Sequence, residues 1–145
     1  VAARVGDVQE LPFEDASFDC ALAAWMLYHV PDVERAVSEL ARVLRPAGRL
    51  VAVTNRREHL QELAELVADW PLSAFDDVRG PALLSQHFSR VEERDAGGWI
   101  NFPDREAVLS YINSARTMFA PAAIAPDADL PLRVRCAPVI YVACK

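Results

Sequence analysis

The 145-residue sequence has few of the features on which several classes of protein depend. Its three cysteines are an odd number without paired spacing, so we interpret them as small buried hydrophobic residues of a reducing compartment rather than as disulfide partners or metal ligands. Runs of Lys or Arg are absent and the formal net charge is −6, which argues against nucleic acid as a partner. No apolar stretch approaches the roughly 18 residues of a membrane span, and no signal-peptide pattern opens the chain. We therefore expect a cytoplasmic protein with no membrane and no nucleic acid among its partners.

Glycine is also scarce. The sequence has five glycines and no G-x-G, and Gly97-Gly98 follows a polar segment instead of opening a helix. A glycine-rich loop that would let the backbone approach a nucleotide is therefore missing from these residues. The same absence weakens an interpretation as half of a nicotinamide dehydrogenase.

The apolar residues that are present alternate between strand-like and helix-like patterns. Apolar runs predict strands over residues 2–5, 18–25 and 49–54, the second of them apolar enough to be covered on both faces. Apolar residues at helical spacing predict helices from Asp32 to Pro46 and from about Glu58 to Trp70. Short connections between alternating strands and helices imply right-handed crossovers, so the predicted class is α/β with helices on both faces of the sheet.

The second half of the sequence is patterned more loosely. It predicts a short helix over residues 81–88, a half-solvated strand over 89–96 and an aromatic-bearing loop over 97–102. Asp104 is placed to cap a helix reaching Thr117, residues 120–131 fit neither helix nor strand, and residues 132–143 have the composition of one long final strand. No repeat or second domain is evident, so residues 1–145 are expected to form a single domain.

Residues 6–54 carry a resemblance to a known family. They read GDVQELPFEDASFDCALAAWMLYHVPDVERAVSELARVLRPAGRLVAVT, and this run resembles the second half of a class I S-adenosylmethionine-dependent methyltransferase. The resemblance is closest to the type 11-like group that methylates small molecules, and the rest of the chain fits only in the order of its elements. It implies a partial Rossmann-like fold, mostly parallel, with an antiparallel strand at the C-terminus. It also implies methyl transfer from S-adenosyl-L-methionine to a small-molecule acceptor.

The resemblance implies a cofactor site at the carboxyl ends of the strands, where open α/β sheets bind ligands. Asp7 would accept a hydrogen bond from the adenine amino group and the Val8 amide would donate to a ring nitrogen, with residues 11–13 as an apolar wall. Asp7 alone also fits a turn cap. Ala24 and Trp25 would lie beside the methionine part of the cofactor, although Trp25 also fits an ordinary core position.

The acceptor side is defined less sharply. Methyl transfer is a displacement at an activated sulfonium, so the protein supplies mainly alignment and a dry pocket, and a base only if the acceptor must lose a proton. His29 and Tyr28 are the candidates for that base and for acceptor contact, and His29 equally suits a hydrogen-bonded turn. Trp99, Phe102 and Tyr111 either line the acceptor site or pack under a loop.

The resemblance also implies an N-terminal half that this sequence does not contain, with a glycine-rich loop and an acid for the ribose. We therefore expect a C-terminal portion of the domain, with an incomplete cofactor site that binds weakly or not at all. Residues 18–25 would then be an open sheet edge, which either pairs with residues 2–5 or forms a homodimer with a second chain. The alternative function is a non-catalytic binding or dimerisation module that has kept only the fold.

Overall fold

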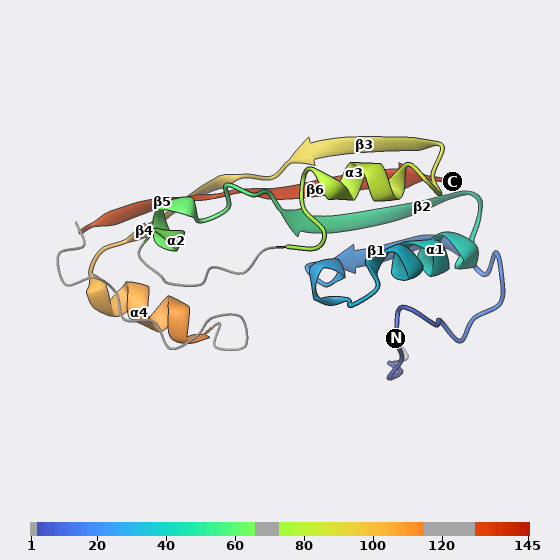
Figure 1. Cartoon of the computed structure of the whole chain (residues 1–145), viewed down its shortest axis with the longest axis horizontal. Helices are drawn as coiled ribbons and strands as arrows, with labels where there is room; N and C mark the ends of the chain where they lie inside the picture. The colour runs from blue at the N-terminus through green and yellow to red at the C-terminus, as the bar shows by residue number, and fades with distance from the viewer. Residues whose placement is uncertain (1–2, 66–72, 115–129) are drawn as a thin grey trace. The chain divides into compact units, whose positions relative to one another are not determined.

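Two β-sheets organise the chain (Figure 1). The computed structural model describes residues 3–65, 73–114 and 130–145. These residues form two compact units, which are treated separately below. Unit 1 contains Val1–Arg56, Ser73–Ala96 and Pro138–Lys145, and unit 2 contains Arg57–Leu72 and Gly97–Ala137. The single domain expected from the sequence stays a prediction.

The four-stranded sheet of unit 1 has the strand order β1-β2-β6-β3. β1 is parallel to β2, and β6 is antiparallel to both β2 and β3, so three strands run one way and the C-terminal strand runs against them. The predicted α/β class, with an antiparallel strand at the C-terminus, is confirmed. The strands are Phe18–Ala24 (β1), Leu44–Asn55 (β2), Arg90–Asp95 (β3) and Pro138–Cys144 (β6).

Helix α1 (Val33–Val43) begins as the sequence predicts and ends earlier. The Asp32 carboxylate accepts a hydrogen bond from the Arg35 amide at 3.0 Å, which satisfies a free N–H group of the first turn. The helix ends before Pro46, because Leu44 is already extended and belongs to β2. At this end the ammonium group of Lys145 donates to the carbonyls of Ala41 and Leu44, both at 2.7 Å, and so satisfies exposed acceptors of the helix terminus.

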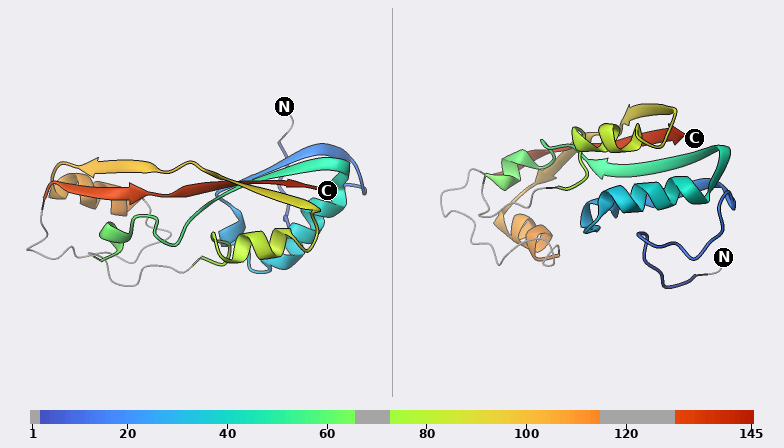
Figure 2. Two further views of the ribbon diagram at one scale, coloured as in Figure 1. Left: turned by 90° about the horizontal axis from the view of Figure 1, so that it is seen from above. Right: turned by 45° about the vertical axis from the view of Figure 1, so that its right-hand side comes forward.

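The helices of unit 1 cover one face of its sheet. α1 and the short α3 (Arg79–Leu84) lie on the same side (Figure 2), and their core residues pack against alternating positions of the strands. The sequence predicted helices on both faces. On the opposite face, Leu22, Val51 and Val142 are neighbours across three strands and remain partly or largely exposed. Within the described residues, helices therefore cover one face of this sheet, and the apolar composition of its strands did not predict which faces are covered.

β1 forms one edge of this sheet. Within the described part of the chain it pairs with β2 alone, and Leu22 is 68% exposed. The predicted strand over residues 2–5 is wrong for the residues described there, since Ala3 to Gly6 are irregular and Val5 is fully exposed. Pairing between that segment and β1 is wrong for the same reason. Cys20, expected to be buried, is exposed on this edge strand.

Unit 2 is built on a two-stranded antiparallel sheet of β4 (Gly98–Phe102) and β5 (Leu132–Cys136). The short α2 (Gln61–Ala64) and α4 (Arg105–Ser114) supply the rest of its core. Asp104 caps α4 as predicted, accepting from the Ala107 amide at 2.9 Å. The ends predicted for these helices at Trp70 and Thr117, and most of the irregular segment 120–131, lie outside the described residues.

One loop prediction and one strand prediction in this part of the sequence are wrong. Residues 97–102 were expected to form a loop but contain β4, because β5 supplies a pairing partner for the residues that follow the two glycines. The predicted long strand over residues 132–143 is interrupted at Ala137 and contributes β5 to one sheet and β6 to the other. Predicted strand 89–96 and helix 81–88 correspond to β3 and, with shifted bounds, to α3.

Tyr141 of β6 supports a first prediction. Its side chain is fully buried, and its hydroxyl has no hydrogen-bond partner among the described residues. Burial raises the pKa of this phenol. Because an unpaired buried hydroxyl costs stability, Tyr141→Phe is expected to raise the free energy of unfolding by about 1 kcal/mol in urea titrations. Tyr141→Ala, the cavity-forming control, should lower it by about 3–5 kcal/mol. A loss of more than about 1 kcal/mol in Tyr141→Phe would instead show a hydrogen-bonded hydroxyl.

Candidate functional site

A pocket of about 630 Å³ in unit 1 brings together two segments of the predicted site. One segment carries Asp7 and Val8, and the other follows β1 and carries His29. The complete lining is Gly6, Asp7, Val8, Gln9, Met26, His29, Val30 and Pro31. Three residues chosen from the sequence therefore line one pocket, although His29 lies 21 positions after Val8 in the chain.

Asp7 lies at the mouth of this pocket with its carboxylate exposed. Its Oδ1 accepts hydrogen bonds from the backbone amide of Gln9 at 2.9 Å and from the Gln9 side-chain amide at 3.0 Å. Its Oδ2 accepts from the same side chain at 3.0 Å. These bonds, first the backbone and then the side-chain one, lower the pKa of Asp7, so the group is an ionised acceptor at neutral pH. The turn-capping role considered for Asp7 is thus present beside the pocket.

Val8 and Met26 provide the apolar part of the lining. Both side chains are half-buried and also pack against the core of unit 1. The next residue along, Leu27, is fully buried in that core and anchors the short 3-10 helix η1 (Leu27–His29). Burial of Leu27 therefore fixes the segment from which Met26 and His29 reach the pocket.

The predicted residues Ala24 and Trp25 lie where β1 ends, outside the pocket lining. The Trp25 amide donates to the Val53 carbonyl at 2.9 Å, which extends the β1–β2 ladder by one residue. Trp25 has a φ of 49°, in the left-handed region that a bulky residue rarely adopts. Its side chain is 51% exposed, so it is not part of the core. The turn at Trp25 redirects the chain from β1 into η1.

Tyr28 and His29 are adjacent members of η1. Their ring centroids lie 4.4 Å apart and the rings are tilted by 54°. Tyr28 is half-buried against the core, and this burial raises the pKa of its phenol. His29 is exposed and lines the pocket. Of these two candidates, His29 has the ring that solvent and a ligand can reach.

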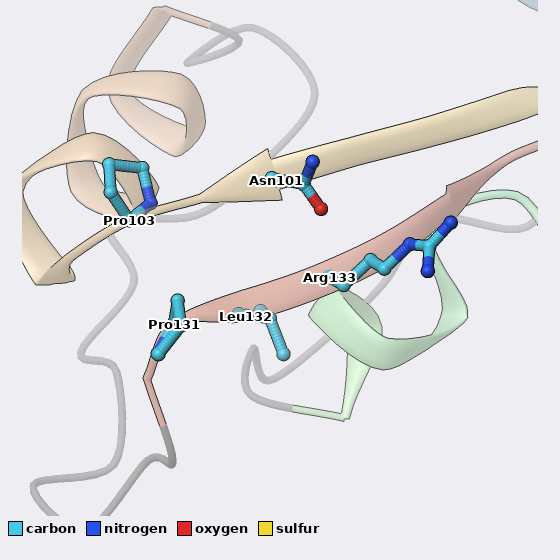
Figure 3. Close-up of a pocket in the computed structure, with 5 residues that line it drawn as sticks. All are labelled: Asn101, Pro103, Pro131, Leu132 and Arg133. Atoms are coloured by element: carbon cyan, nitrogen blue, oxygen red, sulfur yellow. The ribbon is translucent and has the colours of Figure 1, made fainter.

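The three aromatic residues proposed for the acceptor lie in unit 2. Phe102 is buried in that unit's core, with its ring 5.4 Å from the ring of Tyr111 in an edge-on arrangement. Trp99 is exposed, and the Arg133 guanidinium lies 4.4 Å from its ring centroid. A shallow pocket of about 460 Å³ on this sheet is lined by Asn101, Pro103, Pro131, Leu132 and Arg133, and by none of the three (Figure 3). Their role in acceptor binding stays a prediction.

The polar face of α1 holds the loop that continues from the pocket lining, and residues 11–13, expected from the sequence to be an apolar wall, lie outside that lining. The Glu39 carboxylate accepts a hydrogen bond from the Leu11 amide at 2.9 Å. The Arg42 guanidinium donates to the carbonyls of Leu11 and Phe13 at 3.1 and 2.8 Å and pairs with Glu39 at 2.6 Å. One turn earlier, Arg35 donates to the Gln9 carbonyl at 2.7 Å. A single helix thus fixes the backbone of residues 9–13.

The Glu39–Arg42 pair is electrostatically strong. Mainly the hydrogen bond from Arg42, with help from the Leu11 amide, lowers the pKa of Glu39 to about 2. The hydrogen bonds that Arg42 donates to Glu39 and then to Asp15 raise the pKa of Arg42. The Glu39 side chain is only 19% exposed, so it is shielded from solvent more than an ordinary surface carboxylate.

Sequence reasoning did not single out Gln9, Arg35, Glu39 or Arg42. Residues 35, 39 and 42 recur at helical spacing opposite the apolar stripe, and this pattern was available in the sequence. On an amphipathic helix such a row usually faces solvent, so the pattern by itself does not indicate a contact with a distant loop.

The stretch of sequence that carries this pocket matches a known family. The methyltransferase domain family model matches residues 1–52, which include Asp7, Val8 and His29. An uncharacterized methyltransferase of Mycobacterium tuberculosis is 34% identical over 116 residues, covering 77% of this chain and 45% of that protein. The chain is thus similar to class I S-adenosylmethionine-dependent methyltransferases, and its residues 1–52 match the methyltransferase domain. It spans less than half the length of that relative.

Solved structures support the fold of this chain. A putative methyltransferase from Bacillus halodurans aligns with a TM-score of 0.64 and 18% identity, over 97% of this chain and 69% of the other. A S-adenosylmethionine-dependent methyltransferase from Thermotoga maritima, described as a possible histamine N-methyltransferase, aligns with a TM-score of 0.59 and 18% identity, over 97% and 62%. At this identity the likeness establishes the fold alone.

The described residues contain neither a candidate membrane-spanning helix nor a candidate metal site. None of the helices in the described residues combines the length and hydrophobicity needed to cross a membrane. Across the same residues, no three His, Cys, Asp or Glu side chains come together as a candidate metal site.

The depressed pKa of Glu39 gives a second prediction. A carboxylate whose pKa is lowered in the folded state stabilises the fold at pH values above its ordinary pKa of 4.5. This stabilisation is lost as the pH falls toward 2. Glu39→Gln keeps an acceptor for the Leu11 amide but loses the ion pair, so unfolding at pH 7 should cost about 1 kcal/mol less.

Urea titrations of both proteins at pH 7, 5 and 3 measure this effect. The stability difference between the two proteins should shrink as the pH falls, because only the unmodified protein loses the Glu39 contribution. Glu34→Gln, an exposed change in the first turn of the same helix, serves as the control. A difference that is constant with pH would show that the pair does not stabilise the fold.

Proposed function

We propose that the protein transfers a methyl group from S-adenosyl-L-methionine to a small-molecule acceptor. The observation that carries the proposal is the pocket in which Asp7, Val8 and His29 meet, within the region matched by the methyltransferase domain. Asp7 and Val8 would hold the adenine of the cofactor. When bound, the cofactor supplies an activated methyl group on a sulfonium, so the protein's task is to bind, orient and exclude water.

The chemistry of the pocket fits an adenine ring. Adenine has flat apolar faces and a hydrogen-bonding edge with an amino group. Val8, Met26 and Val30 supply apolar surface, and the ionised Asp7 carboxylate supplies an acceptor at the mouth. Ala24 and Trp25, at the end of β1, are proposed to lie near the methionine part of the cofactor.

His29 is proposed as the base where the acceptor must lose a proton. Its ring is exposed and lines the pocket, and imidazole is the side chain that most often serves as a general base. Tyr28, Trp99, Phe102 and Tyr111 remain the proposed acceptor contacts. The free cysteines and acidic composition are in keeping with a cytoplasmic location.

Residues 1–145 are proposed to hold only part of the cofactor site. Asp7 is the one carboxylate among the residues lining the pocket, so this pocket has no second acid for the ribose hydroxyls. The sequence also has no G-x-G for close backbone approach. We therefore expect these residues to bind S-adenosylhomocysteine more weakly than micromolar.

The cofactor proposal gives a third prediction. Asp7→Asn should weaken S-adenosylhomocysteine binding by about tenfold, because an amide replaces the charged acceptor. Titrations followed by NMR measure such weak binding and report shifts at Val8 and His29. Glu10→Gln, which removes a neighbouring acid outside the pocket lining, should bind as the unmodified protein does. Equal affinities of Asp7→Asn and the unmodified protein would place the adenine elsewhere.

The edge strand β1 supports a second candidate function, a homodimerisation module. Its free edge is unpaired within the described residues, and Leu22 is 68% exposed on it. A long apolar edge strand offers unpaired N–H and C=O groups to a strand of a second chain. We propose that two copies associate through this edge.

This proposal gives a fourth prediction. Leu22→Lys should lower the dimer fraction measured by size exclusion with light scattering, because a charge at the edge opposes strand addition. Val78→Lys places the same charge at another exposed apolar residue, 56% exposed, and should leave the dimer fraction unchanged. A monomeric unmodified protein at high concentration would rule the proposal out.

A further inference from the structure

Gln9 connects the proposed adenine acceptor to the start of α1. Its side-chain Nε2 donates to both oxygens of Asp7 at 3.0 Å, and its Oε1 accepts a hydrogen bond from the Asp32 amide at 3.0 Å. Its backbone also takes part, since the amide donates to Asp7 and the carbonyl accepts from Arg35. The polar atoms of this one residue thus engage the pocket mouth on one side and the helix on the other.

Only one orientation of the Gln9 amide satisfies both neighbours. The Asp7 carboxylate accepts hydrogen bonds, so it requires the NH₂ group, and the Asp32 backbone offers a donor, so it requires the oxygen. A flipped amide would set oxygen against carboxylate and NH₂ against N–H. The two hydrogen-bond partners therefore fix the orientation of the Gln9 side-chain amide.

The contacts leave Asp7 able to accept a further hydrogen bond. Oδ1 already accepts from two Gln9 nitrogens, whereas Oδ2 accepts from one. A carboxylate has about four lone-pair sites, so capacity remains on Oδ2. Gln9 therefore sets the direction in which the free acceptor points without occupying it.

We propose that Gln9 is a positioning residue, whose side-chain amide orients Asp7 so that this carboxylate selects a purine bearing an amino group over one bearing an oxo group. An amino group donates to the oriented oxygen, while an oxo group would face it with a second acceptor. Glutamate at this position would still accept from Asp32 but would repel Asp7. The inference rests on the proposed function, because it takes the adenine to lie against Asp7.

The test compares two ligands that differ only at this purine position. S-adenosylhomocysteine carries the amino group, and S-inosylhomocysteine carries an oxo group in its place. The unmodified protein should bind the first roughly tenfold more tightly in NMR titrations. Gln9→Ala and Gln9→Glu should bring the ratio of the two dissociation constants close to one. Gln86→Ala, an exposed glutamine outside the pocket lining, should keep the original ratio.

The ratio separates positioning from a merely structural role. A residue that only supports the fold would weaken both ligands equally, so an unchanged ratio in both Gln9 variants would overturn the inference while the proposed function stands. In an Asp7→Asn background the effect of Gln9→Ala on the ratio should disappear, because the carboxylate that Gln9 orients is gone. An effect that persists there would also overturn it.

A measurement without ligand keeps the inference testable if these residues bind neither compound, a result that the proposed partial cofactor site allows. The hydrogen bonds from Gln9 lower the pKa of Asp7. An NMR titration of the Asp7 carboxyl should therefore give a higher pKa in Gln9→Ala than in the unmodified protein or in Gln86→Ala. The same pKa in all three would show that the Gln9 side chain does not hold this carboxylate.

Discussion

The pair formed by Glu39 and Arg42 joins the sheet of unit 1 to the loop that follows its pocket lining. The apolar face of α1 packs on the sheet, and its polar face binds the backbone of residues 9–13 through Glu39, Arg42 and Arg35. A loop without regular structure needs partners for its N–H and C=O groups, and α1 supplies several of them. The positions of Gln9, which lines the pocket, and of the loop after it therefore depend on a helix whose own position is fixed by hydrophobic burial.

Local features of the fold were predictable from the sequence. The caps at Asp32 and Asp104, the apolar stripe of α1 and the composition of β3 each depend on residues a few positions apart. Strand predictions were wrong where the outcome depended on a distant partner. Residues 97–102 become a strand because β5 pairs with them, and the residues before Gly6 have no such partner within the described part of the chain. Composition does not state which neighbour is present.

In the candidate site, too, residues within a local motif were predicted, and residues whose role depends on a distant contact were missed. Asp7, Val8 and His29 were found because a spaced motif carries them, and the structure places them in one pocket. Gln9 was missed because its significance depends on the Asp32 amide, 23 residues away, and on a carboxylate beside it. Glu39 and Arg42 were missed because a charged row on an amphipathic helix usually faces solvent. In each case the missing information is a contact between segments, which a single sequence does not give.

The pocket is fixed at both of its sides by different interactions. On one side, the Trp25 amide continues the β1–β2 ladder, and the left-handed turn at this residue directs Met26 and His29 toward the pocket. On the other side, Gln9 and the polar row of α1 hold Asp7 and the loop that follows. Both sides depend on α1 and β2 remaining packed together. Because a ligand that binds only the folded state stabilises it by mass action, ligand affinity and the stability of the α1–β2 packing must be linked in this protein.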